Sequence, residues 1–334
     1  MDEDKRAPKN IANALLRAIG SIHLSGDKPD VVLLSTPRSG STWLFEMITA
    51  EPGVRPCNEP LNIRKSIIAR KLGISSWEEL AAPESRGEVK RYLERISHGK
   101  LGYKFKTPRP FDRGYNLISN RVAFKILFGL EREIQWIKDE LGCQIVCLTR
   151  HPLPVSLSRE VHPRLESLCR VMSPTFSIEQ SSLVEDILQS DDQLRKAVLD
   201  WTLQNLPLQQ AFDSVDLFVT YEQIVLQPAY VVEELVGVLG LRDTDKISAS
   251  MTKLSGSVAK SSSASLEMLK DREHDKYALL EKWRPSVCEE QEQSLMSILE
   301  LFGVDLYRTA SVLPDPRYWL GDNYPVDSIH STNS

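Results

Sequence analysis

Short, continuous apolar runs alternate with stretches of helical periodicity along most of this chain of 334 residues. Two runs have the uninterrupted apolar character of strands that are buried on both faces of a parallel sheet, namely Val31 to Leu34 and Ile145 to Leu148. A third strand is predicted over Val215 to Val219, where Asp216 interrupts the apolar residues. Leu130 to Leu141 has helical spacing directly before the second run, which completes a strand–helix–strand unit. The pattern predicts an α/β fold in which helices flank a central parallel sheet.

Start and stop signals predict three further helices. One begins at Ser75 and Ser76, which acidic residues follow; one covers Ala229–Leu239 between Pro228 and Gly240; and one runs from a Ser286–Glu289 capping box to near Gly303.

The chain divides into one domain and two short extensions. We expect a single domain over 28–310, since α/β folds of this length often form one. A helical extension over 1–27 precedes it, with Ile11, Leu15, Ile19 and Ile22 on one face. That face would pack on the domain or on a second subunit of a homodimer. An irregular tail with three prolines is expected over 311–334.

Composition excludes several classes of protein. With 41 basic and 46 acidic residues the net charge is −5, which argues against a nucleic-acid partner. The five cysteines have no metal-ligand spacing, so we expect no metal, reduced thiols and a cytoplasmic protein. No segment contains the roughly 18 apolar residues of a transmembrane helix, and the first residues lack the apolar run of a secretory signal.

The first strand leads into a turn that suits an anion. After Val31 to Leu34 come Pro37 and Gly40, which end the strand, and then Ser41 and Thr42, where a helix can begin. Such a turn directs several backbone N–H groups and the positive end of a helix at one point, where a phosphate or sulfate could bind. An ordinary strand-to-helix turn is the alternative.

This turn differs from the loop of nucleoside triphosphatases. That loop has a Lys directly after its second Gly, followed by a hydroxyl residue that binds magnesium. Here Ser41 follows Gly40, and the cation, Arg38, comes two positions before the Gly. No later apolar strand ends in an acidic residue that would hold magnesium.

A second strand end carries similar chemistry. The run Ile145 to Leu148 is followed by Arg150, and Ser158 comes eight positions later, where we expect the next helix. An Arg can hold a phosphate with two parallel N–H bonds, and a hydroxyl can add another. Because parallel sheets bind ligands at the carboxyl ends of their strands, the two segments predict a ligand with two anionic groups.

These motifs resemble a known family of enzymes. Thr36-Pro-Arg-Ser-Gly-Ser-Thr-Trp-Leu44 is similar to the 5′-phosphosulfate loop of sulfotransferases that use 3′-phosphoadenosine 5′-phosphosulfate (PAPS). Arg150-His-Pro152 with Ser158 resembles their 3′-phosphate element, and Thr220-Tyr-Glu-Gln-Ile-Val-Leu-Gln-Pro228 resembles a third stretch after a strand. The resemblance covers 28–305 and implies a three-layer, P-loop-like fold.

The resemblance also implies how the donor is bound. Arg38 would contact the 5′-phosphate and the bridging oxygen of the leaving group, and Arg150 and Ser158 would hold the 3′-phosphate. Backbone groups and hydroxyls would hold the 5′ end, and two aromatic residues would pack around the adenine. The further residues with these roles are Ser39, Gly40, Ser41, Thr42, Trp43 and Tyr221. Core packing is the alternative for Trp43, as a strand-end position is for Tyr221.

The general base is assigned through a second branch of the family. Cytosolic members place a His after a Lys-Thr pair, but here Pro108 follows Lys106-Thr107. The carbohydrate and trehalose-type sulfotransferases have a Glu-Pro downstream of the first loop, and Asn58-Glu59-Pro60 occupies that place. Glu59 is therefore the candidate base, and Glu46, further along the first helix, is its competitor.

Lysines are the candidates for stabilising charge on the leaving group. Lys125 interrupts the apolar run Ala123 to Phe128, where a charge is costly unless it finds a partner or solvent. It is therefore a catalytic candidate, with an edge strand that turns Lys125 to water as the alternative. Lys104 and Lys106 would share one face of a strand. Lys260 lies in a Ser-rich segment that resembles the family's loop over the nucleotide.

The acceptor is left open by the sequence. Residues 60–120 and 160–212 should form its pocket, and they contain Trp77, Tyr92, Tyr103, Phe105, Tyr115 and Trp201, which could equally be core. A small molecule, a carbohydrate or a lipid with a hydroxyl would fit, and the Glu-Pro pair favours a sugar or aliphatic hydroxyl. Two other functions stay open: an ATP-dependent P-loop kinase and a non-catalytic nucleotide-binding protein.

Overall fold

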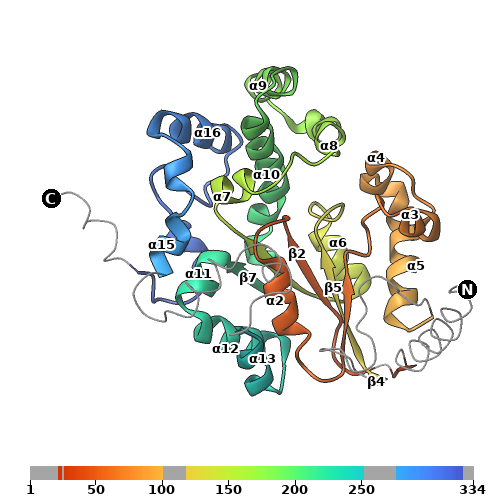
Figure 1. The fold of residues 1–334 in the computed structure, drawn as a ribbon. Coiled ribbons are helices and arrows are strands. Elements are labelled where there is room, and N and C mark those ends of the chain that lie inside the picture. Colours follow the sequence, from red (N-terminus) through yellow and green to blue (C-terminus); the bar gives the residue numbers. More distant parts are fainter. Residues whose placement is uncertain (1–21, 25, 101–117, 252–275, 326–334) are drawn as a thin grey trace, which may run out of the picture.

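The computed structural model describes residues 22–24, 26–100, 118–251 and 276–325. In these ranges five parallel strands form one sheet in the order β3-β5-β2-β6-β7 (Figure 1). The strands are β2 (Val31–Ser35), β3 (Val54–Asn58), β5 (Arg121–Ile126), β6 (Gln144–Thr149) and β7 (Leu217–Thr220). A separate two-residue pair joins β1 (Ile22–His23) to β4 (Ile118–Ser119).

Helices connect the strands and cover the sheet. Between β2 and β6 they are α2 (Ser41–Ile48), α3 (Ser66–Leu72), α4 (Trp77–Ala81), α5 (Arg86–Ser97) and α6 (Ile134–Trp136). After β6 they are α7 (Pro152–Leu157), α8 (Leu165–Met172), α9 (Ile178–Gln189), α10 (Gln193–Gln210), α11 (Tyr221–Leu226), α12 (Pro228–Leu239), α13 (Thr244–Met251), α15 (Lys276–Glu281) and α16 (Glu289–Leu301).

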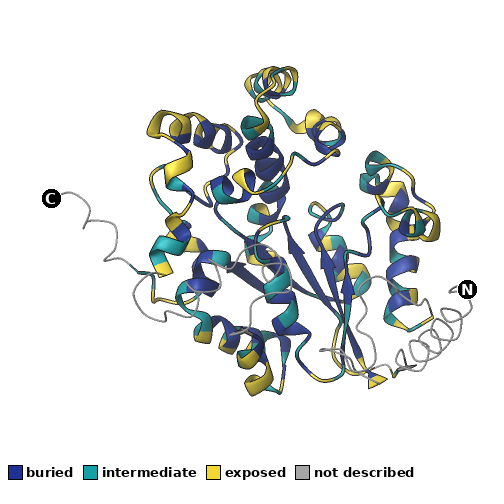
Figure 2. Cartoon of the chain, viewed as in Figure 1, coloured by how far each residue is buried: buried dark blue, intermediate teal, exposed yellow. Residues whose placement is uncertain are grey.

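The central strand β2 shows why the fold has three layers. Its four apolar residues are at most 1% exposed, and they alternate between two hydrophobic cores. Val31 and Leu33 belong to the core that α2, α12 and α13 cover, and Val32 and Leu34 belong to the opposite core, with α5, α7 and α10. Figure 2 shows the resulting buried sheet inside helices whose outer faces are exposed. The predicted α/β fold is confirmed.

The two predicted anion-binding turns lie at a topological switch point. After β2 the chain enters α2 on one face of the sheet, whereas after the neighbouring β6 it enters α7 on the other face. Connections that leave adjacent strands toward opposite faces open a crevice at the carboxyl edge, which is where ligands of such folds bind.

Most of the predicted elements are present, and two need correction. The helix predicted over Leu130 to Leu141 begins only at Ile134 and continues as a π-helix over Ile137–Leu141. The preceding residues form a turn, since Glu131 accepts a hydrogen bond from the Gly129 N–H at 2.7 Å. The capping box before α16 uses Cys288 and Gln291 instead of Ser286 and Glu289. Ser286 belongs to the preceding 3-10 turn.

Several predictions concern residues outside the described ranges. They are the helical face from Ile11 to Ile19, the strand with Lys104 and Lys106, the loop with Lys260, and the aromatic residues Tyr103, Phe105 and Tyr115. Ile22, expected on that helical face, instead lies in β1 and pairs with Ile118. Within the described ranges, none of the helices combines the length and the apolar character needed to cross a bilayer.

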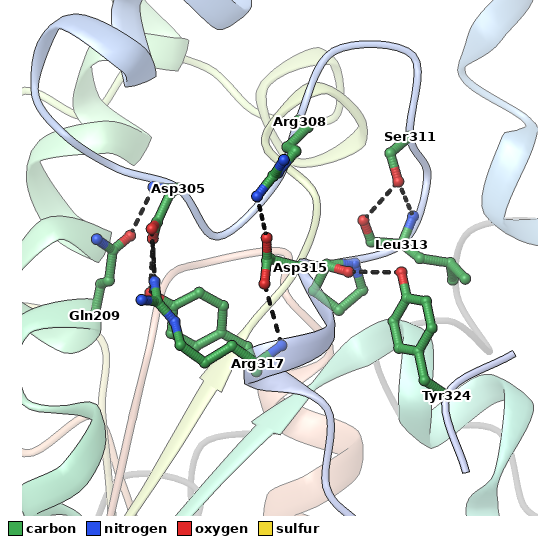
Figure 3. Close-up of polar contacts among 10 residues, drawn as sticks. Gln209, Asp305, Arg308, Ser311, Leu313, Asp315, Arg317 and Tyr324 are labelled. Carbon is green, nitrogen blue, oxygen red and sulfur yellow. Dashed lines mark hydrogen bonds and ion pairs between the residues drawn. The ribbon is translucent and has the colours of Figure 1, made fainter. Parts of the chain in front are cut away.

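The segment after α16 is irregular but firmly packed. Arg317 contacts both carboxylate oxygens of Asp305, at 2.7 and 2.6 Å, and Arg308 pairs with Asp315 at 2.7 Å (Figure 3). Tyr318 also donates to Asp305, at 2.7 Å, and is only 2% exposed. The described part of the predicted tail, 311–325 (the C-terminal strap), also packs on α11, where Gln223 accepts a hydrogen bond from the Leu320 N–H at 3.0 Å. We expect it to contribute to stability.

Replacing Tyr318 with Ala should lower the free energy of unfolding by about 3–5 kcal/mol, because it removes a buried ring. Arg308→Ala should cost less than about 1 kcal/mol, since the Arg308 side chain is 75% exposed and its ion pair is screened by water. Urea unfolding of both variants measures the difference. Equal, small effects would show that the C-terminal strap does not support the domain.

Candidate active site

The turn between β2 and α2 holds its residues in a strained conformation. Arg38 has φ of 72°, which few residues other than glycine adopt, and Gly40 has φ of 85°. The hydroxyls of Thr36 and Ser39 lie 2.5 Å apart and brace the turn from inside. Gly40 is the N-cap of α2 and has no side chain to occupy the first N–H groups of the helix. These groups are therefore available to an anion.

The second turn meets the first directly. Arg150, at the end of β6, donates through Nη1 to the Arg38 carbonyl oxygen at 3.1 Å. Arg38 Nε lies 3.5 Å from the Ser158 hydroxyl, at the limit of a hydrogen bond. The sequence predicts Ser158 inside a helix, but in the structure it is the C-terminal cap of α7. The two predicted anion sites thus form one continuous surface.

Tyr221, directly after β7, contacts residues that follow β2 and β6. The Arg150 guanidinium carbon lies 4.1 Å from the centre of the Tyr221 ring, and Trp43 approaches the same ring edge-on at 6.3 Å. The ring also lies against the first turn, where a Cβ added to Gly40 would come within 2.6 Å of Tyr221 Cδ2. The residues predicted to bind the donor are therefore neighbours in space.

Buried polar groups hold the second turn from behind. Trp201 Nε1 donates to the Arg150 carbonyl at 3.1 Å, and the Glu222 carboxylate accepts from the His151 N–H at 3.0 Å. Tyr307 donates to the other Glu222 oxygen at 2.7 Å. Burial raises the pKa of Glu222 and lowers that of His151 from 6.5 to about 3. Sequence reasoning gave Glu222 and Tyr307 no role; the signal available was a Glu directly after a buried strand.

Glu59 and Lys125 lie together beside the first turn. Glu59 has φ of 56°, and its N–H donates to the Lys125 carbonyl at 2.8 Å. Lys125 Nζ lies 3.7 Å from a Glu59 oxygen and donates to the Thr42 hydroxyl at 3.1 Å. Lys125 therefore connects the candidate base to the start of α2. A strained backbone at both Arg38 and Glu59 is typical of functional sites.

The edge-strand alternative for Lys125 is wrong. β5 lies between β3 and β2, and Lys125 is only 2% exposed. A buried ammonium needs a charged or polar partner. The Glu59 carboxylate is the charged partner of Lys125, and the Thr42 hydroxyl is its polar partner. Lys65, which the sequence did not single out, pairs with the second Glu59 oxygen at 3.7 Å. Of the six aromatic residues proposed for the acceptor pocket, Tyr92 and Trp201 belong to the core instead.

The buried His151 makes stability depend on pH. Its pKa is lower in the folded protein than the unfolded value of 6.5, so below pH 6.5 the unfolded chain binds more protons. The free energy of unfolding should fall as the pH is lowered from 6.5 toward 3. Urea titrations at pH 4 to 7 should show that His151→Asn removes about 1 kcal/mol per pH unit of this slope. An unchanged slope would show that His151 is not held neutral by the fold.

The chain matches a known protein family and is similar to several solved structures. The family model described as the sulfotransferase domain matches residues 28–301. The sulfotransferase domain of the Synechococcus PCC 7002 olefin synthase is 19% identical, with 85% of this chain and 98% of that chain covered and a TM-score of 0.43. Mouse sulfotransferase SULT7A1, solved with 3′-phosphoadenosine 5′-phosphate (PAP), is 19% identical, with 85% and 87% covered and a TM-score of 0.39. A search of curated protein sequences found no match.

The family match decides what the chain is. The matched residues include both candidate anion-binding turns, the Glu59–Lys125 pair and Tyr221, and they make up most of the chain. The resemblance inferred from the sequence motifs is confirmed. The chain belongs to the sulfotransferase domain family, whose members are enzymes that transfer a sulfuryl group to an acceptor.

Proposed function

We propose that this sulfotransferase moves the sulfuryl group of PAPS to a hydroxyl of its acceptor, which gives PAP and a sulfate ester. The observation that carries the proposal is the contact between the two anion-binding turns, since Arg150 Nη1 donates to the Arg38 carbonyl. A donor with phosphate groups at both ends of an adenosine would satisfy both turns at once. A nucleotide with a 5′-phosphate alone would leave the second turn unused.

The donor-binding roles follow from the chemistry of each position. The open N–H groups at the start of α2, with Ser39, Gly40, Ser41 and Thr42, would bind the 5′ end, and Arg38 would neutralise it. Arg150 and Ser158 would bind the 3′-phosphate. The buried Nε of Arg150 has no hydrogen-bond acceptor among the described residues, as expected of a group that serves a ligand. Trp43 and Tyr221 offer rings to the adenine.

Glu59 and Lys125 would carry the transfer step. The Glu59 carboxylate lies 3.7 Å from the Lys65 and Lys125 ammonium groups, and it would accept the proton of the acceptor hydroxyl. The acceptor oxygen bonds to sulfur as the bond from sulfur to the bridging phosphate oxygen breaks. Lys125, beside Thr42 and the first turn, would stabilise the negative charge that collects on that oxygen.

The acceptor and the cellular setting are proposed only as broad classes. A sulfotransferase needs an acceptor, and a hydroxyl of a small molecule, carbohydrate or lipid is proposed here. All five cysteines are free thiols, four of them buried, which supports a reducing, cytoplasmic setting. An ATP-dependent kinase would need a magnesium-binding carboxylate beside the first turn, where the carboxylate present, Glu59, is paired with two lysines. A non-catalytic nucleotide-binding protein would need no base at Glu59.

Binding of PAP and AMP tests the donor site, because AMP lacks only the 3′-phosphate. The protein should bind PAP at least about tenfold more tightly than AMP, since charge-assisted hydrogen bonds to one phosphate are lost. Arg150→Gln should remove this preference, and Ser158→Ala should reduce it. Arg38→Gln should weaken both ligands by a similar factor, because both carry the 5′-phosphate. Calorimetric titration measures all four proteins.

A loss of PAP and AMP binding by equal factors in both Arg150→Gln and Ser158→Ala would contradict a 3′-phosphate site. Tighter binding of ADP than of PAP by the unmodified protein would favour the kinase function.

Replacing Glu59 with Gln should lower kcat for sulfuryl transfer by about 100-fold or more while PAP binding changes little. Gln keeps the side-chain shape but cannot accept the proton. Glu46→Gln is the matched control, since it makes the same change on the helix that follows the first turn, and it should keep its activity. Transfer of labelled sulfate from PAPS to a panel of hydroxyl compounds gives the rates. Full turnover by Glu59→Gln would show that another group is the base.

A further inference from the structure

His162 forms part of an aromatic cluster at the same edge of the sheet as Lys125. Its ring lies 4.2 Å from the ring of Phe128, which comes three residues after Lys125 and just past β5. Trp77, the first residue of α4, meets the His162 ring edge-on at 5.4 Å. His162 is only 8% exposed, so its ring nitrogens are largely removed from water.

The contacts of His162 fix which nitrogen carries its hydrogen. The backbone N–H of Arg164 donates to Nδ1 at 3.2 Å, so Nδ1 is an acceptor and Nε2 carries the hydrogen of the neutral ring. Burial, with Arg164, Arg64 and Arg159 nearby, lowers the pKa of His162 to about 3. Nε2 is thus a buried donor, and it has no acceptor within the described residues. In this state His162 cannot serve as a base.

Other buried donors around His162 also lack acceptors. Arg159 uses one nitrogen to pair with Asp200 at 3.0 Å, but its Nε and Nη1 have no hydrogen-bond partner among the described residues. Arg164 pairs with Glu131 through Nη2, and its Nε is likewise unpartnered there. Several N–H groups therefore remain unused, and the two buried Asp200 oxygens also have no hydrogen-bond partner within the described residues. Unsatisfied buried donors are rare in folded proteins and are typical of places where a ligand or water completes the bonding.

Arg64 adds an exposed charge to this group. It lies five residues after Glu59, and its charge contributes to the lowered pKa of His162. In the described part of the chain, Arg64 has no hydrogen bond or ion pair. The group formed by Arg64, Arg159, His162 and Arg164 (the donor cluster) follows directly on the two segments that carry Glu59 and Ser158. Arg159 is thus the direct neighbour of Ser158 in the chain, and His162 packs on Phe128, three residues after Lys125.

We propose that the donor cluster is an acceptor subsite that binds an anionic oxygen group of the acceptor, namely a carboxylate, sulfate or phosphate. Trp77 and Phe128 would pack against the carbon skeleton that joins this group to the reacting hydroxyl. This inference rests on the proposed sulfuryl transfer at Glu59 and narrows the acceptor to hydroxyl compounds that carry a negative charge. Neutral acceptors would leave the buried donors unpaired.

Matched pairs of ligands test the proposal on the full chain saturated with PAP, which fills the donor site. The pairs are glucuronate and glucose, glucose 6-phosphate and glucose, and 3-hydroxydecanoate and its methyl ester. Calorimetry should show that the charged member of at least one pair binds about tenfold or more tightly than its neutral partner. The pairs also show whether a carboxylate or a phosphate, on a sugar or on an acyl chain, is preferred.

Substitutions then connect the preference to the donor cluster. His162→Phe keeps an aromatic ring beside Phe128 but removes the donor, and Arg64→Gln removes the exposed charge; each should reduce the charged-to-neutral preference by about tenfold. His162→Gln, which retains an N–H donor, and Arg64→Lys, which retains the charge, should keep part of it. Arg70→Gln, an exposed Arg on α3 outside the cluster, should keep all of it.

The proposal is wrong if no charged ligand binds more tightly than its neutral partner. It is also wrong if His162→Phe and Arg64→Gln weaken both members of a pair equally. Normal PAP binding by the same variants separates either result from a failure of the donor-site assignment, which predicts no role for these residues in PAP binding.

Discussion

The contact that the proposed active site depends on is the stacking of Arg150 over Tyr221, with Gly40 also close to the ring. It joins the ends of three strands, β2, β6 and β7, that are brought together only by the sheet. A side chain at position 40 would collide with Tyr221, and the positive φ there independently favours glycine. This one contact therefore sets the distance between the two anion-binding turns, and through it the length of the ligand that can bind both.

Hydrogen bonds around Arg38 and Arg150 hold these two like charges close together without a ligand. Arg38 and Arg150 carry like charges, yet one donates to the backbone of the other, and the backbone of Arg150 is in turn held by Trp201. Behind them Glu222 and Tyr307 form a buried, hydrogen-bonded pair. Burying such polar groups costs free energy, but a fully hydrogen-bonded network favours a single arrangement of its side chains. The strained backbone at Arg38 and Glu59 is held in place by hydrogen bonds to Arg150 and Lys125.

Local signals made the strands, the two turns and the motif residues predictable. An apolar run such as Val31 to Leu34 or a Gly at the start of α2 acts within a few residues. The sequence could not show what depends on strand order: that Lys125 is in an interior strand, that Glu59 pairs with it, or that His162 packs on Phe128. The capping box of α16 was missed because its cap is a cysteine, and the packing of the C-terminal strap because partners such as Gln223 and Leu320 are 97 residues apart in the chain.

A crystal structure with bound PAP tests the central claim most directly, because it locates both phosphates at once. The account predicts the 5′-phosphate against the N–H groups at the start of α2 and the 3′-phosphate in contact with Arg150 and Ser158, with the adenine beside Trp43 or Tyr221. A complex in which either phosphate points into solvent, or in which the nucleotide occupies a different edge of the sheet, would contradict it.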